Sequence, residues 1–283
     1  MLRTLRVLLP VAIALVSCTK GDKVPAYIDV NAVSVTTEPL QGSATSNITD
    51  VWVYADDELL GSWEVPSRIP LLREGSTRIR ITPGVKRNGA FDDRSIYPFY
   101  TSWTGSVDVM RTTSVELTPV VGYNEAADFW IEAFEDPGFA FFSLEETDTL
   151  LRFTPQTDPA IVLDESPCGG FIVRPENSYA RFYTDEDFSA TGGPTFLELD
   201  YKSNITLTVG VLFTLDGIAQ AEPYVYVAPS DRTDPSMPWK KIYIDLSPVF
   251  NLGISQRDIY FEASLPSGQS EGVVYVDNIK LVR

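Results

Sequence analysis

The chain has 283 residues and a formal net charge of −17, from 22 Lys and Arg against 39 Asp and Glu. This charge excludes tight binding to nucleic-acid phosphates and gives no attraction to anionic lipid head groups. The sequence contains no histidine, which excludes Ser-His-Asp and Cys-His catalysis, histidine zinc sites and imidazole proton transfer. Carboxylate pairs, as in glycoside hydrolysis, or a lysine or tyrosine base are the catalytic groups that remain.

Residues 1–17 have the order of a secretory signal peptide, because two arginines precede an apolar run and small Ser17 stands before Cys18. The apolar run is shorter than the roughly 20 residues of a membrane-spanning helix, so we expect cleavage. The last four residues, Leu15 to Cys18, resemble the lipobox of bacterial lipoproteins. This resemblance implies that Cys18 is acylated and becomes the new amino terminus. The alternative is an ordinary signal peptide in which Cys18 is incidental.

Cleavage before Cys18 would leave 266 residues with 20 basic and 39 acidic side chains, a net charge of −19. Residues 18–26 would form a short lipidated tether that keeps the first domain close to the membrane. Cys168 would be the only free thiol, so no disulfide within the chain is expected. We expect Cys168 to be a small buried residue; as a nucleophile, the alternative, it would lack a histidine to activate it.

Nearly every later segment has the pattern of a β-strand. Segments such as ITDVWVYAD, FLELDYKS and GVVYVDNIKLV are rich in Val, Ile, Thr and aromatic residues, and most alternate apolar with polar residues. No window has a convincing helical period. The sequence therefore predicts an all-β protein, with a small β-sandwich over residues 27–122 and a second β-sandwich over residues 126–283.

Residues 53–84, VYADDELLGSWEVPSRIPLLREGSTRIRITPG, resemble a PEGA-type module. The positions that match the turns and strand ends of that family are Asp56, Asp57, Gly61, Pro70, Gly75, Pro83 and Gly84. Glycines supply turn conformations here, and Pro83 is expected to end ladder pairing. The resemblance implies a small PEGA/Ig-like sandwich that serves as a binding or spacer module and carries no catalytic residues.

The second half resembles the jelly-roll, galactose-binding-like domains that occur as carbohydrate-binding modules. The segments AFEDPG, FLELDYKSN, WKKIYIDLS and VVYVDNIKLVR carry this resemblance. In that family an acidic residue near the first strand and the aspartate of the last strand often hold a structural calcium ion. The matching positions are Glu135 and Asp277, with Asp136 nearby; ordinary surface acids are the alternative, and no other cofactor is expected.

Sugar recognition would need exposed aromatic rings beside polar groups that bind hydroxyls. The candidate glycan-binding residues are Tyr179, Tyr183, Tyr201 and Tyr224. For each of them, packing in the core or across strands is the alternative. Trp239 alternates with Lys241 and Tyr243 in WKKIYIDLS, so we expect it to pack in or beneath a sheet.

The stretch SIYPFYTSW, residues 95–103, is denser in aromatic residues than a loop requires. Aromatic residues are enriched at protein interfaces. The candidates for docking an outer-membrane protein partner are Tyr97, Phe99, Tyr100 and Trp103. Buried strand residues would have the same composition.

The lipobox, the PEGA-like module and the jelly roll together resemble a Bacteroidota-type outer-membrane lipoprotein. The resemblance implies attachment to the outer membrane through the lipid on Cys18, on its periplasmic or its cell-surface face. Our leading expectation is a non-catalytic binding or scaffolding subunit of an outer-membrane protein complex. The alternative is a surface glycan-binding lipoprotein. A carboxylate-dependent glycoside hydrolase comes third, because no paired-acid motif stands out.

Overall fold

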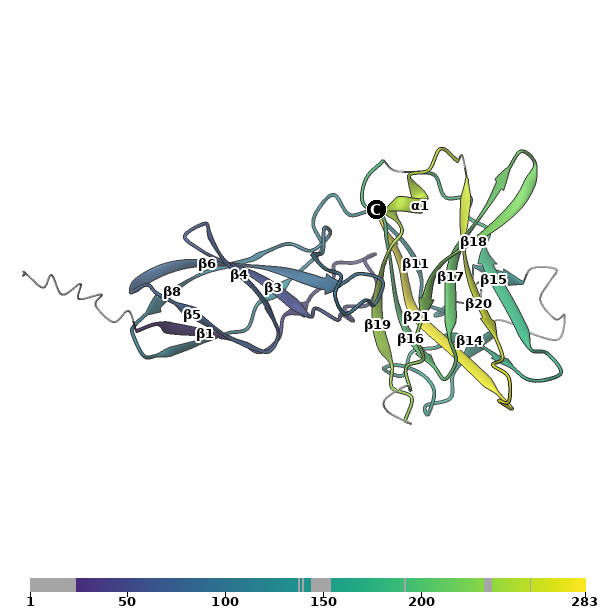
Figure 1. Cartoon of the computed structure of the whole chain (residues 1–283), viewed down its shortest axis with the longest axis horizontal. Helices are drawn as coiled ribbons and strands as arrows, with labels where there is room; N and C mark the ends of the chain where they lie inside the picture. Colours follow the sequence, from purple (N-terminus) through teal and green to yellow (C-terminus); the bar gives the residue numbers. More distant parts are fainter. Residues whose placement is uncertain are drawn as a thin grey trace, which may run out of the picture.

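The computed structural model describes residues 24–283, except 137, 139, 144–153, 191, 232–235 and 255. Cys18 and the predicted signal peptide therefore lie outside the described residues. The described part contains 21 strands and one short helix, α1 (Ser247–Phe250), arranged as two β-sandwiches that lie end to end (Figure 1). The predicted all-β fold is confirmed. No helix in the described part is long and apolar enough to cross a membrane.

The first sandwich contains ten strands. They are β1 (Ala26–Val30), β2 (Ser34–Val35), β3 (Asp50–Ala55), β4 (Glu58–Glu64), β5 (Ser67–Leu71), β6 (Gly75–Lys86), β7 (Arg94–Ile96), β8 (Trp103–Val109), β9 (Ser114–Leu117) and β10 (Val120–Val121). One sheet has the order β5-β1-β9, and the other has the order β4-β3-β6-β7 with β8 also beside β6. Strand β10 pairs with β2. Residues of period two, such as Ala26, Ile28 and Val30 in β1, point into the core between the sheets.

The turn between β3 and β4 has the geometry that its sequence predicts. Asp56 and Asp57 both have positive φ, 47° and 67°, as a two-residue type I′ hairpin requires. Pro83, in contrast, does not end ladder pairing, because it lies within β6 and pairs with Val51. That prediction is wrong because β6 pairs with β8 up to Ile81 and with β7 from Gly84 onward. The proline, which has no N–H, lies where β6 changes partner.

The second sandwich is a jelly roll of two antiparallel sheets. Its strands are β11 (Phe129–Glu132), β12 (Phe141–Ser143), β13 (Thr154–Gln156), β14 (Cys168–Val173), β15 (Tyr179–Thr184), β16 (Phe196–Ser203), β17 (Leu207–Leu215), β18 (Ile218–Val227), β19 (Lys240–Asp245), β20 (Arg257–Ser264) and β21 (Gly272–Val282). One sheet, here the junction sheet, has the order β13-β14-β21-β16-β19, with β11 beside β21. The other, here the distal sheet, has the order β12-β15-β20-β17-β18. In Figure 1 the first sandwich meets the junction sheet, and the distal sheet lies on the opposite side.

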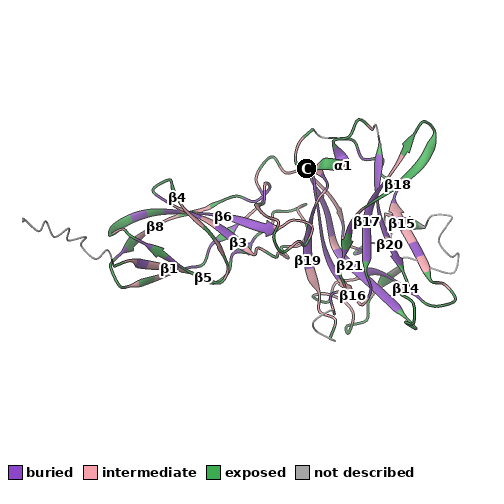
Figure 2. Cartoon of the chain, viewed as in Figure 1, coloured by how far each residue is buried: buried purple, intermediate pink, exposed green. Residues whose placement is uncertain are grey.

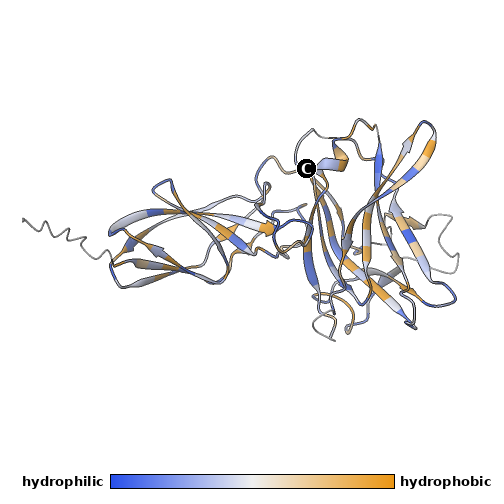
Figure 3. Cartoon of the chain, in the orientation of Figure 1, coloured by the Kyte–Doolittle hydropathy of each residue, from blue (hydrophilic) through white to orange (hydrophobic). Residues whose placement is uncertain are grey.

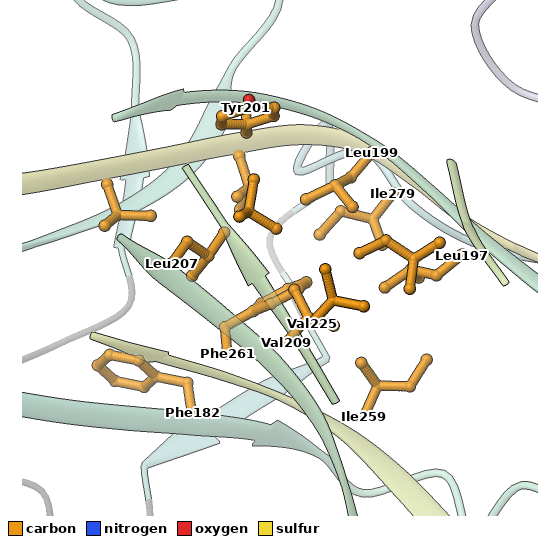
Figure 4. Packing of buried hydrophobic residues seen from close by; sticks show 14 of the residues in the cluster. Phe182, Leu197, Leu199, Tyr201, Leu207, Val209, Val225, Ile259, Phe261 and Ile279 are labelled. Atoms are coloured by element: carbon orange, nitrogen blue, oxygen red, sulfur yellow. The ribbon is translucent and has the colours of Figure 1, made fainter. Parts of the chain in front are cut away.

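The core of the jelly roll lies between these two sheets. Buried residues concentrate on the inner strands of both sheets, whereas the tip of the β17–β18 hairpin is exposed (Figure 2). Hydrophobic and hydrophilic residues alternate along many of the strands (Figure 3). Leu197 and Leu199 of the junction sheet face Val209 and Phe261 of the distal sheet in this core (Figure 4). Alternation therefore turns the residues between them to the two outer faces.

The aromatic residues predicted to dock a protein partner contact the chain's own second sandwich instead. Tyr97 is 0% exposed, and Phe99 and Tyr100 are 5% exposed. The Tyr97 ring lies 5.1 Å from the ring of Phe196 and 5.0 Å from that of Tyr243, measured between centroids. The prediction of an exposed docking patch is therefore wrong for these three residues, because an intramolecular interface buries them.

Trp103, the fourth predicted docking residue, begins β8 and is half-buried. Its ring packs against the core of the first sandwich and covers Gly105, where an added Cβ would lie 2.4 Å from the indole. Trp103 therefore packs along its own strand and against the core, in line with the alternative of buried strand residues for this stretch.

A buried charged network joins the two sandwiches around Glu198 of β16. The hydroxyl of Tyr97 donates a hydrogen bond of 2.6 Å to Glu198 Oε1, and the hydroxyl of Tyr123 lies 2.9 Å from both carboxylate oxygens. Lys241 Nζ lies 3.5 Å from Glu198 Oε2. Lys280 Nζ donates to the Tyr123 hydroxyl at 3.3 Å, and burial lowers the pKa of Lys280 to about 8. Because buried charges require partners, this network ties Glu198 and the lysines of the second sandwich to the tyrosines that precede it in the chain.

Candidate functional site

The outer face of the distal sheet, here the distal face, carries aromatic and charged side chains in two adjacent rows. The strand registers place Tyr226, Thr208, Glu262 and Arg181 side by side in the first row. They place Pro223, Gly210, Tyr260, Tyr183 and Phe142 side by side in the second row. Between the rows, Val209, Phe261 and Phe182 point into the core. Alternation along each strand therefore turns both rows away from the core.

An ion pair lies among the aromatic rings of the distal face. Arg181 Nη2 lies 2.6 Å from Glu262 Oε2, and the hydroxyl of Tyr179 donates to the same oxygen at 2.8 Å. The guanidinium carbon lies 5.1 Å from the centroid of the Tyr260 ring and 5.8 Å from that of Tyr179. Both charged side chains stay partly exposed, at 18% and 19%. The contacts hold a carboxylate, a guanidinium and a phenol in a defined arrangement next to solvent.

The aromatic rings of this face present apolar surface on both sides of the ion pair. Tyr226 is 69% exposed and Phe142 is 51% exposed, and Tyr179 and Tyr183 are half-buried. The rings of Phe142 and Tyr183 lie 6.3 Å apart. Exposed rings of this kind can stack against the C–H face of a sugar, while neighbouring charged and hydroxyl groups bind its hydroxyls.

Tyr260 lies directly under the polar part of the distal face. Its ring covers Gly210, where an added Cβ would lie 2.3 Å from Tyr260 Cζ, so only glycine leaves room for this ring. The Tyr260 hydroxyl is buried, and it has no hydrogen-bond partner among the described residues. Burial raises the pKa of this tyrosine, and the charge of Glu262 adds to the effect. The hydroxyl therefore stays protonated, and within the described part of the chain it is a hydrogen-bonding group without a partner.

The structure brings two of the four predicted glycan-binding tyrosines together. Tyr179 and Tyr183 share the distal face, whereas Tyr224 packs half-buried against the core. Tyr201 is 8% exposed and belongs to the same core (Figure 4). The prediction that Tyr201 is an exposed sugar-binding ring is therefore wrong, because Tyr201 points into the core together with Leu197 and Leu199 of the same strand, β16.

Among the residues of the distal face, sequence reasoning missed the ion pair and the two most exposed rings. They are Arg181, Glu262, Phe142 and Tyr226. Period two was a usable signal for Arg181, since it lies between the chosen residues Tyr179 and Tyr183 in YARFYT. Glu262 gave no comparable signal, because its position opposite Arg181 depends on the pairing of β15 with β20.

The three predicted calcium ligands have different environments. Asp277 is fully buried; its Oδ1 accepts a hydrogen bond from the Asn278 N–H at 2.7 Å, and its Oδ2 has no partner among the described residues. Burial raises the pKa of Asp277 to about 7, and the nearby charge of Glu135 contributes. Glu135 and Asp136 are exposed, and Asp136 accepts the Gly138 N–H at 3.1 Å.

These acids provide an incomplete set of ligands for calcium. The ion takes six to eight oxygen ligands, and the described residues include no group of three or more acidic, histidine or cysteine side chains arranged to hold a metal. The unpartnered Oδ2 of Asp277 is the oxygen that best suits a cation. Calcium binding therefore stays a prediction, in which Asp277 and Glu135 would contribute carboxylate oxygens.

Cys168 is fully buried, and burial raises the pKa of its thiol to about 12. It packs with Val273 and Tyr275 on the outer side of the junction sheet. A thiol that stays protonated at neutral pH is a poor nucleophile. The prediction of a small buried residue is confirmed.

No protein family model and no curated protein matches the sequence. Among solved structures, the chain is similar to the enzymatically active domain of tailspike protein 4 of bacteriophage CBA120, with 15% identity, a TM-score of 0.40, and coverage of 53% of this chain and 20% of that chain. It is similar to a carbohydrate-binding module of the β-sandwich superfamily with promiscuous specificity, with 16% identity, a TM-score of 0.37, and coverage of 83% of this chain and 84% of that chain.

A third similar structure holds the CBM22-1 and GH10 modules of the Clostridium thermocellum xylanase 10B, with 13% identity, a TM-score of 0.39, and coverage of 54% of this chain and 28% of that chain. The chain thus covers a fifth of the tailspike chain and under a third of the xylanase chain. Every one of these TM-scores is below 0.5.

Proposed function

We propose that this chain is a non-catalytic carbohydrate-binding protein that recognises a glycan on the distal face. The observation that carries the proposal is the arrangement of exposed aromatic rings around the Arg181–Glu262 ion pair. The glycan-binding lipoprotein, the alternative that the sequence left open, thereby replaces the scaffolding subunit as the main proposal. A glycoside hydrolase remains the third hypothesis.

The chemistry of the distal face suits a sugar better than it suits a protein helix or an apolar ligand. Phe142 and Tyr226 offer exposed rings on which a flat pyranose ring can stack. Glu262, Arg181 and the Tyr179 hydroxyl lie between the rings and can exchange hydrogen bonds with sugar hydroxyls. The mixture of polar and aromatic groups, rather than a continuous apolar patch, favours a glycan ligand.

The position of the distal face in the fold supports a role in binding glycans outside the cell. Strand β1, the first described strand, lies at the end of the first sandwich that is farthest from the second sandwich (Figure 1). We propose that lipid on Cys18 holds the protein at the outer membrane and that the first sandwich acts as a spacer. The distal face would then point away from the membrane, toward glycans on the outer side.

The case for a dedicated outer-membrane protein partner is weaker than the sequence indicated. Its main motivation was the aromatic stretch of residues 95–103, and Tyr97, Phe99 and Tyr100 in that stretch are buried inside the chain. A partner would have to bind elsewhere on the surface.

Glycan-array binding of residues 18–283, produced with Cys18→Ser, tests the proposal. We expect the wild-type residues to bind a defined set of glycans, and we expect Tyr226→Ala and Phe142→Ala each to weaken that binding at least tenfold. Tyr54→Ala is the matched control, because this tyrosine also stacks with an arginine, at 3.6 Å from Arg80, but lies in the first sandwich. Absence of specific glycan binding by the unsubstituted chain would overturn the proposal.

A further inference from the structure

A second candidate site lies where the two sandwiches meet. A cavity of about 630 Å³ opens there, and its wall combines residues of both sandwiches. Ser46, Asn47 and Lys86 come from the first sandwich and its loops, and Asp200, Trp239 and Lys240 belong to the second. Volumes of this size are typical of small-ligand sites. The cavity shares no residue with the distal face.

The acidic residue in the cavity wall is already neutralised by protein groups. Asp200 Oδ2 accepts hydrogen bonds from the Thr45 hydroxyl at 2.6 Å and from the Asn278 amide at 3.0 Å. Lys241 Nζ lies 3.8 Å from the same oxygen. Lys241 and Asp200 therefore offset each other's charge and leave the cavity little net negative potential from this pair.

Two further lysines leave the cavity with a positive character. Lys86 Nζ lies 3.4 Å from Oε1 of the exposed Glu64 and 5.3 Å from the centroid of the Phe91 ring. Among the described residues, no carboxylate lies within ion-pairing distance of Lys240. In a chain with 39 acidic side chains, the wall of this cavity contains three lysines, Lys86, Lys240 and Lys241, and one aspartate, Asp200. This excess of positive charge provides a local attraction for an anion.

Trp239 supplies one aromatic ring of the cavity wall. Its indole N–H donates a hydrogen bond to the Ile161 carbonyl at 2.9 Å, which fixes the ring orientation. Asn47 is fixed as well, because its side-chain amide donates to the Lys241 carbonyl at 3.1 Å. A rigid ring next to ammonium, hydroxyl and amide groups suits a ligand that has an apolar face, several hydroxyls and a negative charge.

We propose that this junction cavity is a second carbohydrate site, one that binds an acidic sugar such as a uronic acid unit. The carboxylate of the sugar faces Lys86 and Lys240, and its ring lies against Trp239. A simple inorganic anion would use the lysines but gain nothing from the indole. A neutral sugar would use the indole but leave the lysines without a partner. The proposal does not depend on glycan binding at the distal face.

Isothermal titration of the full chain tests this site, in a detergent without sugar head groups. The probes are trigalacturonate, neutral galactotriose and sodium sulfate. We expect trigalacturonate to bind at least tenfold more tightly than either of the other two probes. Equal binding of galactotriose that persists in Tyr226→Ala, equal binding of sulfate, or no saturable binding of trigalacturonate would each overturn the proposal.

Variants assign the binding to the cavity. Lys240→Gln and Lys86→Gln should each weaken trigalacturonate binding at least fivefold, and both side chains are partly exposed, so the fold should persist. Arg111→Gln is the matched charge control, because its exposed ion pair with Glu74 lies in the first sandwich away from the cavity. Tyr226→Ala, which tests the distal face, should leave the part of trigalacturonate binding that depends on the two lysines unchanged. Unchanged binding in both lysine variants would contradict the proposal.

Discussion

The two outer faces of the jelly roll carry the same chemical group in different surroundings. On the junction sheet, Glu198 binds two tyrosine hydroxyls and lies beside a lysine, and its side chain is 0% exposed. On the distal sheet, Glu262 binds a tyrosine hydroxyl and an arginine, and its side chain is 19% exposed. Contact with the first sandwich buries the Glu198 carboxylate. The Glu262 carboxylate stays at the surface, where a ligand can reach it.

This difference has an energetic consequence. Removing one member of a buried charge network leaves the others unpaired in a low-dielectric interior, which costs far more than the pair itself contributes. A partly exposed ion pair contributes little to stability, because water and salt compete with it. Glu198 is therefore expected to act on stability, and Glu262 is expected to act on binding.

The largest expected effect is on the unfolding free energy of a Glu198→Gln variant. Without the carboxylate, the buried Lys241 keeps only Asp200, 3.8 Å from its Nζ, and the buried Lys280 loses the nearby negative charge of Glu198. We expect a loss of about 3 to 5 kcal/mol in denaturant titration. Glu262→Gln is the matched variant, with an expected loss below about 1 kcal/mol. Equal losses in the two variants would contradict the contrast between the two faces.

A smaller effect is expected from removing single tyrosine hydroxyls. Tyr97→Phe deletes the 2.6 Å hydrogen bond to Glu198, and a bond to a charged group contributes about 1.5 to 3 kcal/mol. Tyr179→Phe deletes the 2.8 Å bond to Glu262 at little cost in stability, but it should weaken glycan binding. Urea titration and the glycan array together separate the two roles. A Tyr97→Phe variant as stable as the unsubstituted chain would show that the junction does not depend on this bond.

Period-two alternation was enough to predict the strands, and it identified the residues that share a face. It could not identify what covers the other face. In FLELDYKS, Leu197 and Leu199 were readable as core residues, whereas Glu198 and Asp200 look like solvent-facing residues until the first sandwich is placed on them. The aromatic stretch around Tyr97 was ambiguous for the same reason.

The candidate sites depend on strand pairings that one sequence does not reveal. Arg181 and Glu262 are 81 positions apart and meet because β15 pairs with β20. Lys86 and Lys240 belong to different sandwiches and line the same cavity. Tyr201 could have been placed correctly, because it has the same parity in β16 as the core residue Leu199. The alternation within one strand therefore predicted Tyr179 and Tyr183 as binding residues, but it did not predict their charged neighbours Arg181 and Glu262.

A still smaller stability effect is expected from calcium. If Asp277 and Glu135 contribute to a calcium site, a ligand present at about five times its Kd stabilises the fold by about 1 kcal/mol. For a chain of this size we expect chelation to lower Tm by roughly 2 to 4 °C. Asp277→Ala should remove this sensitivity to chelator. An unchanged Tm of the unsubstituted chain after prolonged chelation would leave these residues without a metal role.

The last prediction concerns the pH dependence of stability in the chelator-treated protein. Burial raises the pKa of Asp277 to about 7, whereas an unfolded aspartate titrates near about 3.9. Between these values the folded state binds a proton that the unfolded state does not bind, so stability falls as pH rises from about 4 to about 7. Asp277→Asn carries no titrating group and should lose less stability over this range.

Urea titrations at pH 5 and pH 7.5 measure this difference. We expect Asp277→Asn to gain stability relative to the unsubstituted chain at the higher pH. Lys280, with a pKa lowered to about 8, changes stability mainly above this range, since the unfolded lysine keeps its proton up to about pH 10.4. Asp200 titrates in both proteins, so its contribution largely cancels in the comparison. A stability difference that does not change with pH would show that the buried Asp277 carboxyl is solvated or paired in solution. Asp277 Oδ2 would then no longer support the prediction of a calcium site.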